Sequence, residues 1–322
     1  MKISVVIASY NGVPFISEQL ASIAAQSVVP HEIIVSDDHS TDATKETVEA
    51  FAAQNPQISV KFSVNPSSSG VDNNFAHAIS LAAGDVIFIC DQDDVWLADR
   101  LETMMTVFEK SPHPVATFCD SRIVDENLND LGYTHLQSRG FPSVGQIFAD
   151  DCRGFLKRVP PAGHDMAFHS AFKDVLLPFP DLENCYDTWI GLVLFALGAW
   201  KQSAPIPLTL FRRHSRTVTR SGLVPSVKEK FMQAKKAIDD DICAWYAKMY
   251  QELIDRVGDR ISPEMRLSFE ARRDHSIKRS QMNVKFFKRL KMVYEETKNG
   301  NYFRYGRSYL NIFQDIFLRR AR

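Results

Sequence analysis

The sequence has few cysteines and no long apolar run. Five cysteines are spread over 322 residues, and no two have the C-x-x-C spacing of a zinc or redox site. This pattern excludes a disulfide framework and favours buried free thiols. The longest apolar run, residues 190–200, is far shorter than the ~20 residues that span a bilayer. No secretory signal pattern follows Met1, so we expect a cytoplasmic protein.

Two further absences exclude particular classes of protein. The sequence has no internal period of the kind that builds solenoids. A dinucleotide dehydrogenase would have G-x-G-x-x-G after its first strand, but that position reads Ser9-Tyr10-Asn11-Gly12. Charge is balanced overall at −1 but unevenly distributed. Residues 1–225 hold 16 Lys and Arg against 26 Asp and Glu, and residues 226–322 hold 22 against 13.

The first half of the sequence alternates strand and helix patterns. The predicted strands are residues 3–8, 32–36, 58–64, 86–90 and 115–119. The predicted helices are residues 13–26, 41–53 with Ser40 or Thr41 as the cap, 74–83 and 97–109. Such alternation predicts an α/β fold with a mainly parallel sheet flanked by helices, whose ligands lie beyond the carboxyl ends of the strands. From about residue 224 charged helical patterns take over, which predicts a catalytic domain over 1–224 and a basic helical region over 225–322.

Acidic residues follow the fourth predicted strand. Asp91, Asp93 and Asp94 occupy three of the four positions from 91 to 94. Carboxylates held together repel one another, and a bound cation relieves that repulsion. Oxygen ligands favour Mg²⁺ or Mn²⁺ completed by substrate phosphates, so the pattern predicts a metal–diphosphate site. Two alternatives are a solvated turn and a haloacid-dehalogenase-like phosphatase with Asp91 as nucleophile.

Several motifs agree in their order along the chain. SVVIASYNG, IIVSDDHSTDAT and GDVIFICDQDDVW together resemble family 2 glycosyltransferases of the GT-A fold, which is Rossmann-like. DQDDVW, with NNFAHAI upstream, looks most like the bacterial rhamnosyltransferase-like branch, whose members build cell-surface polysaccharide. The resemblance implies that Asp38 bonds the uracil or thymine imide and that Asp93 ligates the metal. It also implies that Ala8, Tyr10 and Asn11 line the base and ribose pocket and that Asp91 contacts the ribose or the metal shell.

Later motifs supply the remaining roles that the resemblance implies. PPAGHDMAFHS places Gly163 and His164 beside the donor sugar and the acceptor. CYDTWIGLVL resembles the segment of the catalytic base and gives that role to Asp187, preceded by a tyrosine where many members have Glu or His. Asp187 could equally cap a helix that starts at Thr188. LFRRHSRTVTRSG gives phosphate contacts to Arg212 and Arg213 and a phosphate or metal role to His214.

Together these patterns predict an inverting, metal-dependent glycosyltransferase that uses Mg²⁺ or Mn²⁺. The resemblance implies a donor such as dTDP-rhamnose or a UDP-hexose and a polysaccharide, lipopolysaccharide or lipid-linked acceptor. The absence of Q-x-x-R-W argues against a processive synthase. The basic C-terminal region, with Phe286, Phe287, Phe303, Phe313 and Phe317, could lie on the inner face of the cytoplasmic membrane, or these aromatics could pack on the catalytic domain or on a second subunit. No nucleic-acid-binding motif accompanies it. The alternatives are the phosphatase and a non-catalytic nucleotide-sugar-binding protein.

Overall fold

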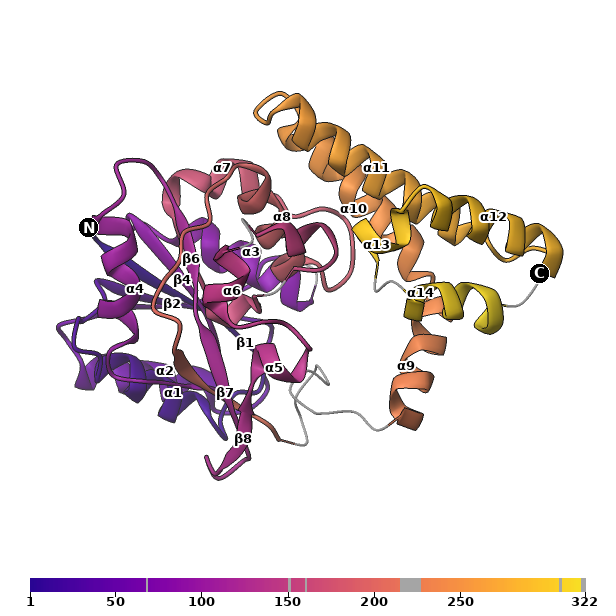
Figure 1. The fold of residues 1–322 in the computed structure, drawn as a ribbon. Coiled ribbons are helices and arrows are strands. Elements are labelled where there is room, and N and C mark those ends of the chain that lie inside the picture. Colours follow the sequence, from indigo (N-terminus) through magenta and orange to yellow (C-terminus); the bar gives the residue numbers. More distant parts are fainter. Residues whose placement is uncertain (68, 150–151, 160, 215–226, 307–308, 320–322) are drawn as a thin grey trace. The chain divides into compact units, whose positions relative to one another are not determined.

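The chain forms two compact units (Figure 1). The computed structural model describes residues 1–67, 69–149, 152–159, 161–214, 227–306 and 309–319. The first unit, here the α/β unit, comprises Met1–Cys152 and Pro160–Leu223. The second, the helical unit, comprises Arg153–Val159 and Val224–Arg322.

The α/β unit contains two sheets. The larger has six strands in the order β3-β2-β1-β4-β9-β6, and the smaller has four in the order β5-β10-β7-β8. Strands β1 to β4 run parallel, and β9 pairs antiparallel with both β4 and β6. The strands are β1 Ile3–Ser9, β2 Glu32–Asp37, β3 Ser59–Val64, β4 Val86–Asp91, β5 Val95–Trp96, β6 Ala116–Phe118, β7 Asp120–Val124, β8 Asp130–Thr134, β9 Met166–His169 and β10 Pro207–Arg212.

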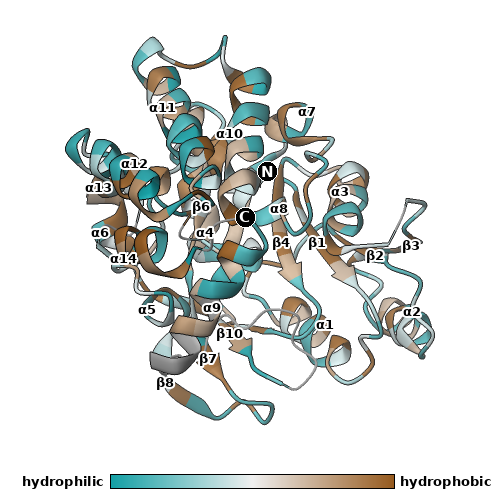
Figure 2. Cartoon of the chain, turned by 90° about the vertical axis from the view of Figure 1, so that its right-hand side faces the viewer, coloured by the Kyte–Doolittle hydropathy of each residue, from teal (hydrophilic) through white to brown (hydrophobic). Residues whose placement is uncertain are grey.

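Helices cover both faces of the large sheet. The longer ones are α1 Ile16–Ala24, α2 Thr44–Gln54, α3 Val71–Leu81, α4 Arg100–Glu109 and α8 Tyr186–Ala196. The shorter ones are α5 His135–Ser138, α6 Val144–Ala149, α7 Lys173–Leu176 and the 3-10 turns η2 Gly163–Asp165 and η3 Ser170–Phe172. Alternate residues of β1, β2 and β4 share one core with α1, α2 and α4, while α3 packs on the opposite face of β1 and β2. Because both faces are covered, the central residues of these strands are apolar on both sides, as the colouring in Figure 2 shows.

The expected α/β fold is confirmed, with several local differences. The four parallel strands and their helices lie where the sequence predicts them, within a few residues. Strands β5 and β7 to β10 were not predicted, since all but β8 pair with segments distant in the sequence. The predicted cap of α2 is wrong: the helix begins at Thr44, and the Ser40 hydroxyl instead bonds the Asp37 carboxylate. All five cysteines are free and buried, as expected.

The helical unit is built from amphipathic helices with clear start signals. Its elements are η1 Arg153–Leu156, α9 Val227–Asp239, α10 Ile242–Val257, α11 Pro263–Ser280, α12 Phe286–Lys298, α13 Asn301–Tyr305, α14 Tyr309–Phe313 and the π-helical turn η4 Gln314–Leu318. The Ser262 hydroxyl caps α11, whose first residue is a proline. The Leu156 carbonyl accepts hydrogen bonds from Tyr250 and Arg272, which attaches η1 to α10 and α11. Within the described part of the chain, no helix combines the length and apolar character needed to cross a membrane.

A buried carboxylate holds the end of the helical unit together. Asp315 is fully buried and accepts hydrogen bonds from Arg279 at 2.6 Å, Arg319 at 2.7 Å and the Tyr302 hydroxyl at 2.8 Å. Burial acts to raise the pKa of Asp315, but the two guanidinium groups outweigh it and hold the pKa below its usual value. Three helical segments, α11, α13 and η4, thereby meet at one side chain.

We expect Asp315→Ala to destabilise the protein by about 3–5 kcal/mol, because it leaves two buried guanidinium groups without their counterion. Thermal unfolding of the full chain, followed by circular dichroism, measures the effect. Asp259→Ala is the matched control, since Asp259 is fully exposed and makes only a 3.7 Å surface pair with Arg266. Equal unfolding midpoints for the two variants would contradict the expectation.

Candidate active site

Strand register brings the predicted site residues to one edge of the large sheet. In the parallel pairing, Ala8 lies opposite Asp91, and Ser9 lies opposite Asp37. The polar segments that follow β1, β2 and β4 therefore start side by side at the carboxyl ends of their strands. This is the edge at which open α/β sheets bind ligands.

The loop after β1 is held by side chains that follow β2. The buried Asp37 carboxylate accepts hydrogen bonds from the Ser9 and Ser40 hydroxyls at 2.7 and 2.6 Å. The Ser40 oxygen in turn accepts from the Asn11 backbone N–H at 2.8 Å. Asn11 has a φ of 47°, a conformation that asparagine tolerates better than most residues. Asp37 therefore supports the loop that carries the predicted nucleotide contacts.

The predicted nucleotide-binding residues at this edge differ in their exposure and in their hydrogen bonds. Tyr10 is 58% exposed, and the Gln92 amide bonds both its N–H and its carbonyl. Asp38 is half-buried, and its carboxylate accepts from the Gly70 N–H at 2.9 Å and from the Asn65 amide at 3.4 Å. Asp38 thus joins the end of β2 to the start of α3.

The acidic turn after β4 pairs with two histidines. The Asp93 carboxylate lies 2.8 Å from His214 Nε2, and the Asp91 carboxylate lies 3.3 Å from His164 Nδ1. Asp94 is fully buried, and one of its oxygens accepts from the Arg212 backbone N–H at 3.1 Å. The predicted metal ligands Asp91, Asp93 and His214 therefore lie in a single acidic turn and the strand end beside it.

Arg212 holds this turn in place. Its side chain is buried, with Nε donating to the Asp93 carbonyl at 2.9 Å and Nη1 donating to the Glu126 carbonyl at 2.7 Å. The guanidinium also forms an ion pair with Glu18 and lies over the Phe15 ring, 4.9 Å from its centroid. Arg213 is half-buried and lies 5.9 Å from the Phe211 ring, and burial lowers its pKa. In this arrangement the donors of Arg212 fix the acidic turn to β10.

His164 lies buried among three carboxylates. Its ring nitrogens are 3.3 Å from Asp91, 4.0 Å from Asp94 and 3.5 Å from Asp165, and the ring stacks on Phe211. Burial acts to lower the pKa of His164, but the surrounding carboxylates raise it to about 10. The imidazole is therefore positively charged at neutral pH. Its charge offsets part of the negative charge concentrated at this edge.

A second layer of buried polar groups orients His164. The Ser121 hydroxyl lies 3.1 Å from His164 Nε2 and donates to the Asp165 carboxylate. Arg100, stacked over Trp96, donates to the His164 carbonyl at 2.6 Å. The sequence did not predict this layer. Asp165 could have been found as the neighbour of His164, but Ser121 and Arg100 are isolated residues that give no local signal.

Gly163 is required because an aromatic ring occupies the space above it. A Cβ atom at this position would lie 2.3 Å from Tyr186 Cε2 and 2.5 Å from the Tyr186 hydroxyl oxygen. The Tyr186 ring stacks on Phe75 at a centroid distance of 4.4 Å, so it has little room to move away. Burial raises the pKa of Tyr186 well above its usual value, and the nearby carboxylates Asp91 and Asp187 add to the effect. The hydroxyl is therefore neutral and available as a donor.

Asp187 lies in the first turn of α8, and the cap of that helix comes from elsewhere. The helix begins at Tyr186, and the Asp72 carboxylate accepts the backbone N–H groups of Cys185 and Tyr186. The alternative in which Asp187 caps a helix starting at Thr188 is therefore wrong. Burial raises the pKa of Asp187, against the opposing influence of Arg139 and of the Thr188 hydrogen bonds. A carboxylate with a raised pKa is a better proton acceptor than an ordinary aspartate.

The acidic turn has the donor set that a hard divalent cation requires. Asp91 and Asp94 offer carboxylate oxygens at one place, with the charged His164 beside them as a counterion, and Asp93 pairs with His214. One Asp94 oxygen is buried without a hydrogen-bond partner among the described residues. Burial and the neighbouring carboxylates raise the pKa of Asp94 despite the opposing His164 charge. Carboxylate oxygens with one imidazole fit Mg²⁺ or Mn²⁺.

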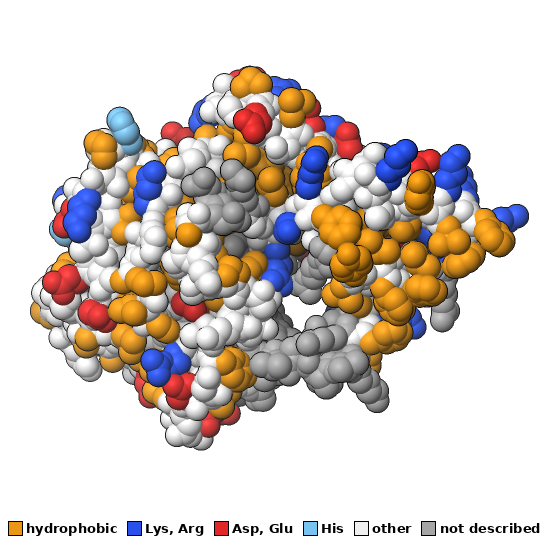
Figure 3. Space-filling view, in the orientation of Figure 1, with side chains coloured by type: hydrophobic (Ala, Val, Ile, Leu, Met, Phe, Trp, Pro, Cys, Tyr) orange, Lys and Arg blue, Asp and Glu red, His pale blue; other side chains and the backbone are white. Residues whose placement is uncertain are grey.

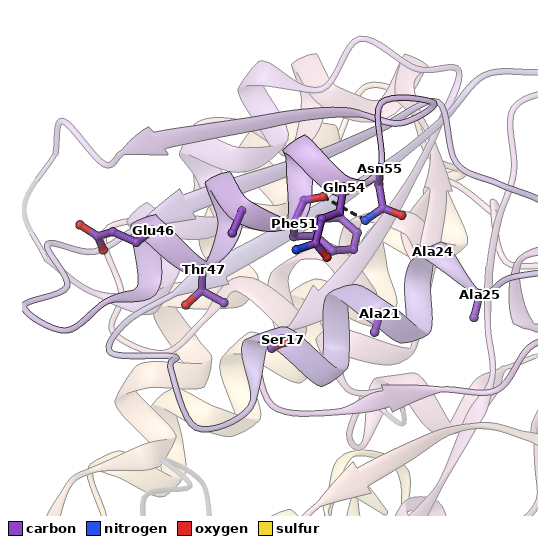
Figure 4. Close-up of a pocket in the computed structure, with 10 residues that line it drawn as sticks. Ser17, Ala21, Ala24, Ala25, Glu46, Thr47, Phe51, Gln54 and Asn55 are labelled. Atoms are coloured by element: carbon purple, nitrogen blue, oxygen red, sulfur yellow. Dashed lines mark hydrogen bonds between the residues drawn. The ribbon is translucent and has the colours of Figure 1, made fainter.

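A separate groove lies between α1 and α2 (Figure 4). It is lined by small and polar side chains of the two helices: Ser17, Ala21, Ala24, Ala25, Glu46, Thr47, Ala50, Phe51, Gln54 and Asn55. None of these residues belongs to the acidic turn or to its partners. The groove therefore plays no part in the candidate site.

We expect Gly163→Ala to destabilise the protein by about 1–3 kcal/mol, because the new methyl overlaps the Tyr186 ring. In the double variant Gly163→Ala/Tyr186→Ala the overlap is gone, so its destabilisation should be smaller than the sum of the single effects. Gly145→Ala is the control, since a Cβ there meets nothing closer than 3.5 Å. Additive effects in thermal unfolding would contradict the proposed contact.

Residues 4–175 match the model of the family described as glycosyl transferase family 2. A protein of Mycobacterium tuberculosis is 27% identical over 236 residues, which cover 72% of this chain and 64% of that protein. The dTDP-rhamnosyl transferase RfbG of Shigella flexneri is 40% identical over 99 residues, 30% of this chain and 34% of RfbG. The Escherichia coli UDP-Glc:alpha-D-GlcNAc-diphosphoundecaprenol beta-1,3-glucosyltransferase WfgD is 29% identical over 109 residues, 34% of this chain and 42% of WfgD. The chain thus spans less than two thirds of the length of these relatives.

Solved structures share the fold. Staphylococcus aureus TarS 1–349 in complex with UDP-GlcNAc superposes with a TM-score of 0.54 at 16% identity, covering 95% of this chain and 89% of TarS 1–349. A mannosyltransferase of Pyrobaculum calidifontis in complex with GDP-Man and Mn²⁺ gives 0.53 at 15% identity, covering 98% and 84%. Because the family model covers more than half of its residues, this chain belongs to glycosyl transferase family 2, and its fold is the GT-A fold.

Proposed function

We propose that the protein transfers a sugar from a pyrimidine nucleoside-diphosphate donor, with inversion, to a hydroxyl of a cell-surface or lipid-linked glycan. The observation that carries the proposal is the pairing of Asp93 with His214 beside the loops that follow β1 and β2. When such a donor is bound, the metal site that holds its diphosphate must lie beside the pocket that holds its pyrimidine ring. The family membership argues against the phosphatase alternative, and turnover of a nucleotide sugar would distinguish the enzyme from a non-catalytic binding protein.

The names of two relatives support the proposed donor and acceptor. RfbG is named as a dTDP-rhamnosyl transferase, and WfgD as an enzyme that uses UDP-Glc and a diphosphoundecaprenol-linked acceptor. We therefore propose dTDP-rhamnose or a UDP-hexose as donor and a lipid-linked or polysaccharide glycan as acceptor. Both donors carry a pyrimidine whose imide could bond Asp38, and Ala8, Tyr10 and Asn11 would line the same pocket.

Asp93, His214 and Asp91 would hold Mg²⁺ or Mn²⁺. A bound cation would neutralise negative charge on the diphosphate that leaves. Arg212 keeps the Asp93 backbone in position, so we propose that it positions the ligands while Arg213 remains the candidate phosphate contact. His164 adds a buried positive charge behind the same turn.

Asp187 would act as the base. The acceptor hydroxyl oxygen forms a bond to the anomeric carbon, the bond from that carbon to the phosphate oxygen breaks, and its electron pair leaves with the nucleoside diphosphate. The hydroxyl proton goes to the Asp187 carboxylate. One displacement inverts the anomeric configuration, and no covalent intermediate forms on the protein. Tyr186, above Gly163, would position the reacting sugar through its neutral hydroxyl.

We expect UDP or dTDP to bind with a Kd at least about tenfold lower when Mn²⁺ is present, and Asp93→Asn to abolish this metal dependence. Isothermal titration calorimetry with and without Mn²⁺ measures both effects. Asp99→Asn is the matched control, because Asp99 is exposed and its side chain makes no capping hydrogen bond to α4. Metal-dependent binding that persists in Asp93→Asn would refute the ligand assignment.

We expect Asp187→Asn to lower kcat by about 10²–10⁴-fold while leaving nucleotide binding intact, because the amide cannot accept the proton. The base is active when deprotonated, and its pKa is raised, so kcat/KM should fall with decreasing pH at a higher pH than an ordinary aspartate would set. Asp181→Asn, at an exposed position before α8, is the control. Near-normal transfer by a folded Asp187→Asn protein would exclude this base.

A further inference from the structure

The helical unit exposes many large aromatic side chains. Phe287 is 83% exposed, Tyr309 76% and Phe317 64%. The exposed aromatic residues of α12, α13, α14 and η4 are Phe286, Phe287, Tyr294, Phe303, Tyr309, Phe313 and Phe317. Figure 3 shows hydrophobic side chains gathered over these elements, with Lys and Arg at their border. Contiguous apolar surface of this kind marks an interaction site more often than chance exposure.

These aromatics are not needed to close the core beneath them. Ile312 and Ile316 of the C-terminal helical segment pack inward against a core of Met282, Val293 and Tyr302. Tyr309, Phe313 and Phe317, each four residues from the next, point to solvent instead. The segment therefore has an inner apolar face that stabilises the helical unit and an outer apolar face that is unused.

On the same elements, most anionic side chains are buried and most cationic side chains are exposed. Glu296 is buried, 2.6 Å from His275 and 2.7 Å from Lys278, and Asp315 is buried between Arg279 and Arg319. The exposed charged residues of 281–306 and 309–319 are Lys285, Lys288, Lys291, Lys298 and Arg304, with Glu295 as the single exposed anion among them. Because two of the three anions are turned inward, the outer surface is cationic.

The two features interleave on α12. Phe287, Lys291, Tyr294 and Lys298 are spaced by four, three and four residues, which places them along one line of the helix. Alternating aromatic and lysine side chains suit the boundary between acyl chains and headgroups, where rings enter the apolar layer and ammonium groups reach the phosphates.

We propose that this aromatic–basic face, formed by the exposed aromatic and basic residues of α12, α13 and α14–η4, binds the surface of a bilayer that contains anionic lipids. The anionic headgroup is the complement of five exposed cations, whereas a second copy of the same face would bring like charges together. The inference goes beyond the transfer reaction, since it concerns the helical unit alone. It would place the enzyme at the surface that holds a lipid-linked acceptor.

Vesicle flotation of the full-length protein tests the proposal without any donor nucleotide, so its result is independent of the proposed transferase activity. We expect the protein to bind vesicles of phosphatidylcholine that contain about 30% phosphatidylglycerol. Salt should weaken this binding, and binding to vesicles of phosphatidylcholine alone should be much lower. The triple variant Lys288→Glu/Lys291→Glu/Arg304→Glu should lower the partition coefficient at least about tenfold. The triple variant Phe287→Ser/Phe313→Ser/Phe317→Ser should lower it by at least about the same factor.

Leu267→Ser is the matched control, because Leu267 on α11 is 64% exposed but lies outside the aromatic–basic face. All variants change exposed side chains, and their unfolding midpoints should equal that of the wild type. Wild-type protein that stays unbound to anionic vesicles, or serine variants that bind like wild type, would overturn the proposal. A dimer in light scattering that only the phenylalanine substitutions dissociate, without vesicle binding, would assign the face to a second copy instead.

Discussion

The site depends on keeping several carboxylates close together without letting the turn that carries them open. Asp91, Asp93 and Asp94 follow a central strand, and Asp165 lies behind them. Their mutual repulsion is opposed by the buried His164 charge and by the buried hydrogen bonds of Arg212. Both partners come from segments far along the chain: His164 lies in η2, and Arg212 ends β10.

Much of this could be predicted from the sequence, because the signal is local. Apolar strands that end in acidic or amide residues identify β1, β2 and β4, and parallel register then places Ala8 opposite Asp91 without further information. The motifs after those strands give the family. The pairing of Asp93 with His214 spans 121 residues, yet both positions carry motif signals of their own.

What could not be predicted depends on long-range contacts between unremarkable residues. Asp37 rather than Ser40 organises the loop after β1, and Asp72 rather than Asp187 caps α8. Arg212 looks like a phosphate ligand in its motif, but its place under the acidic turn gives it structural partners. The burial of anionic side chains in the helical unit could not be predicted either, since Glu295 and Glu296 are adjacent and differ only in the direction they face.

Helix α3 contacts both the loop proposed to bind the nucleotide and the helix that carries the proposed base. Asn74 donates to the Ser9 carbonyl at 3.1 Å and accepts from Ser36, while Asp72 binds the first N–H groups of α8 beside Asp187. One turn of helix thus sets the spacing between the loop after β1 and Asp187, the proposed base. Loops elsewhere around the site could lengthen or shorten to suit another acceptor, but this spacing would stay constant. Helix α3 therefore fixes the distance between the two proposed parts of the site, while the lengths of the surrounding loops are free to vary.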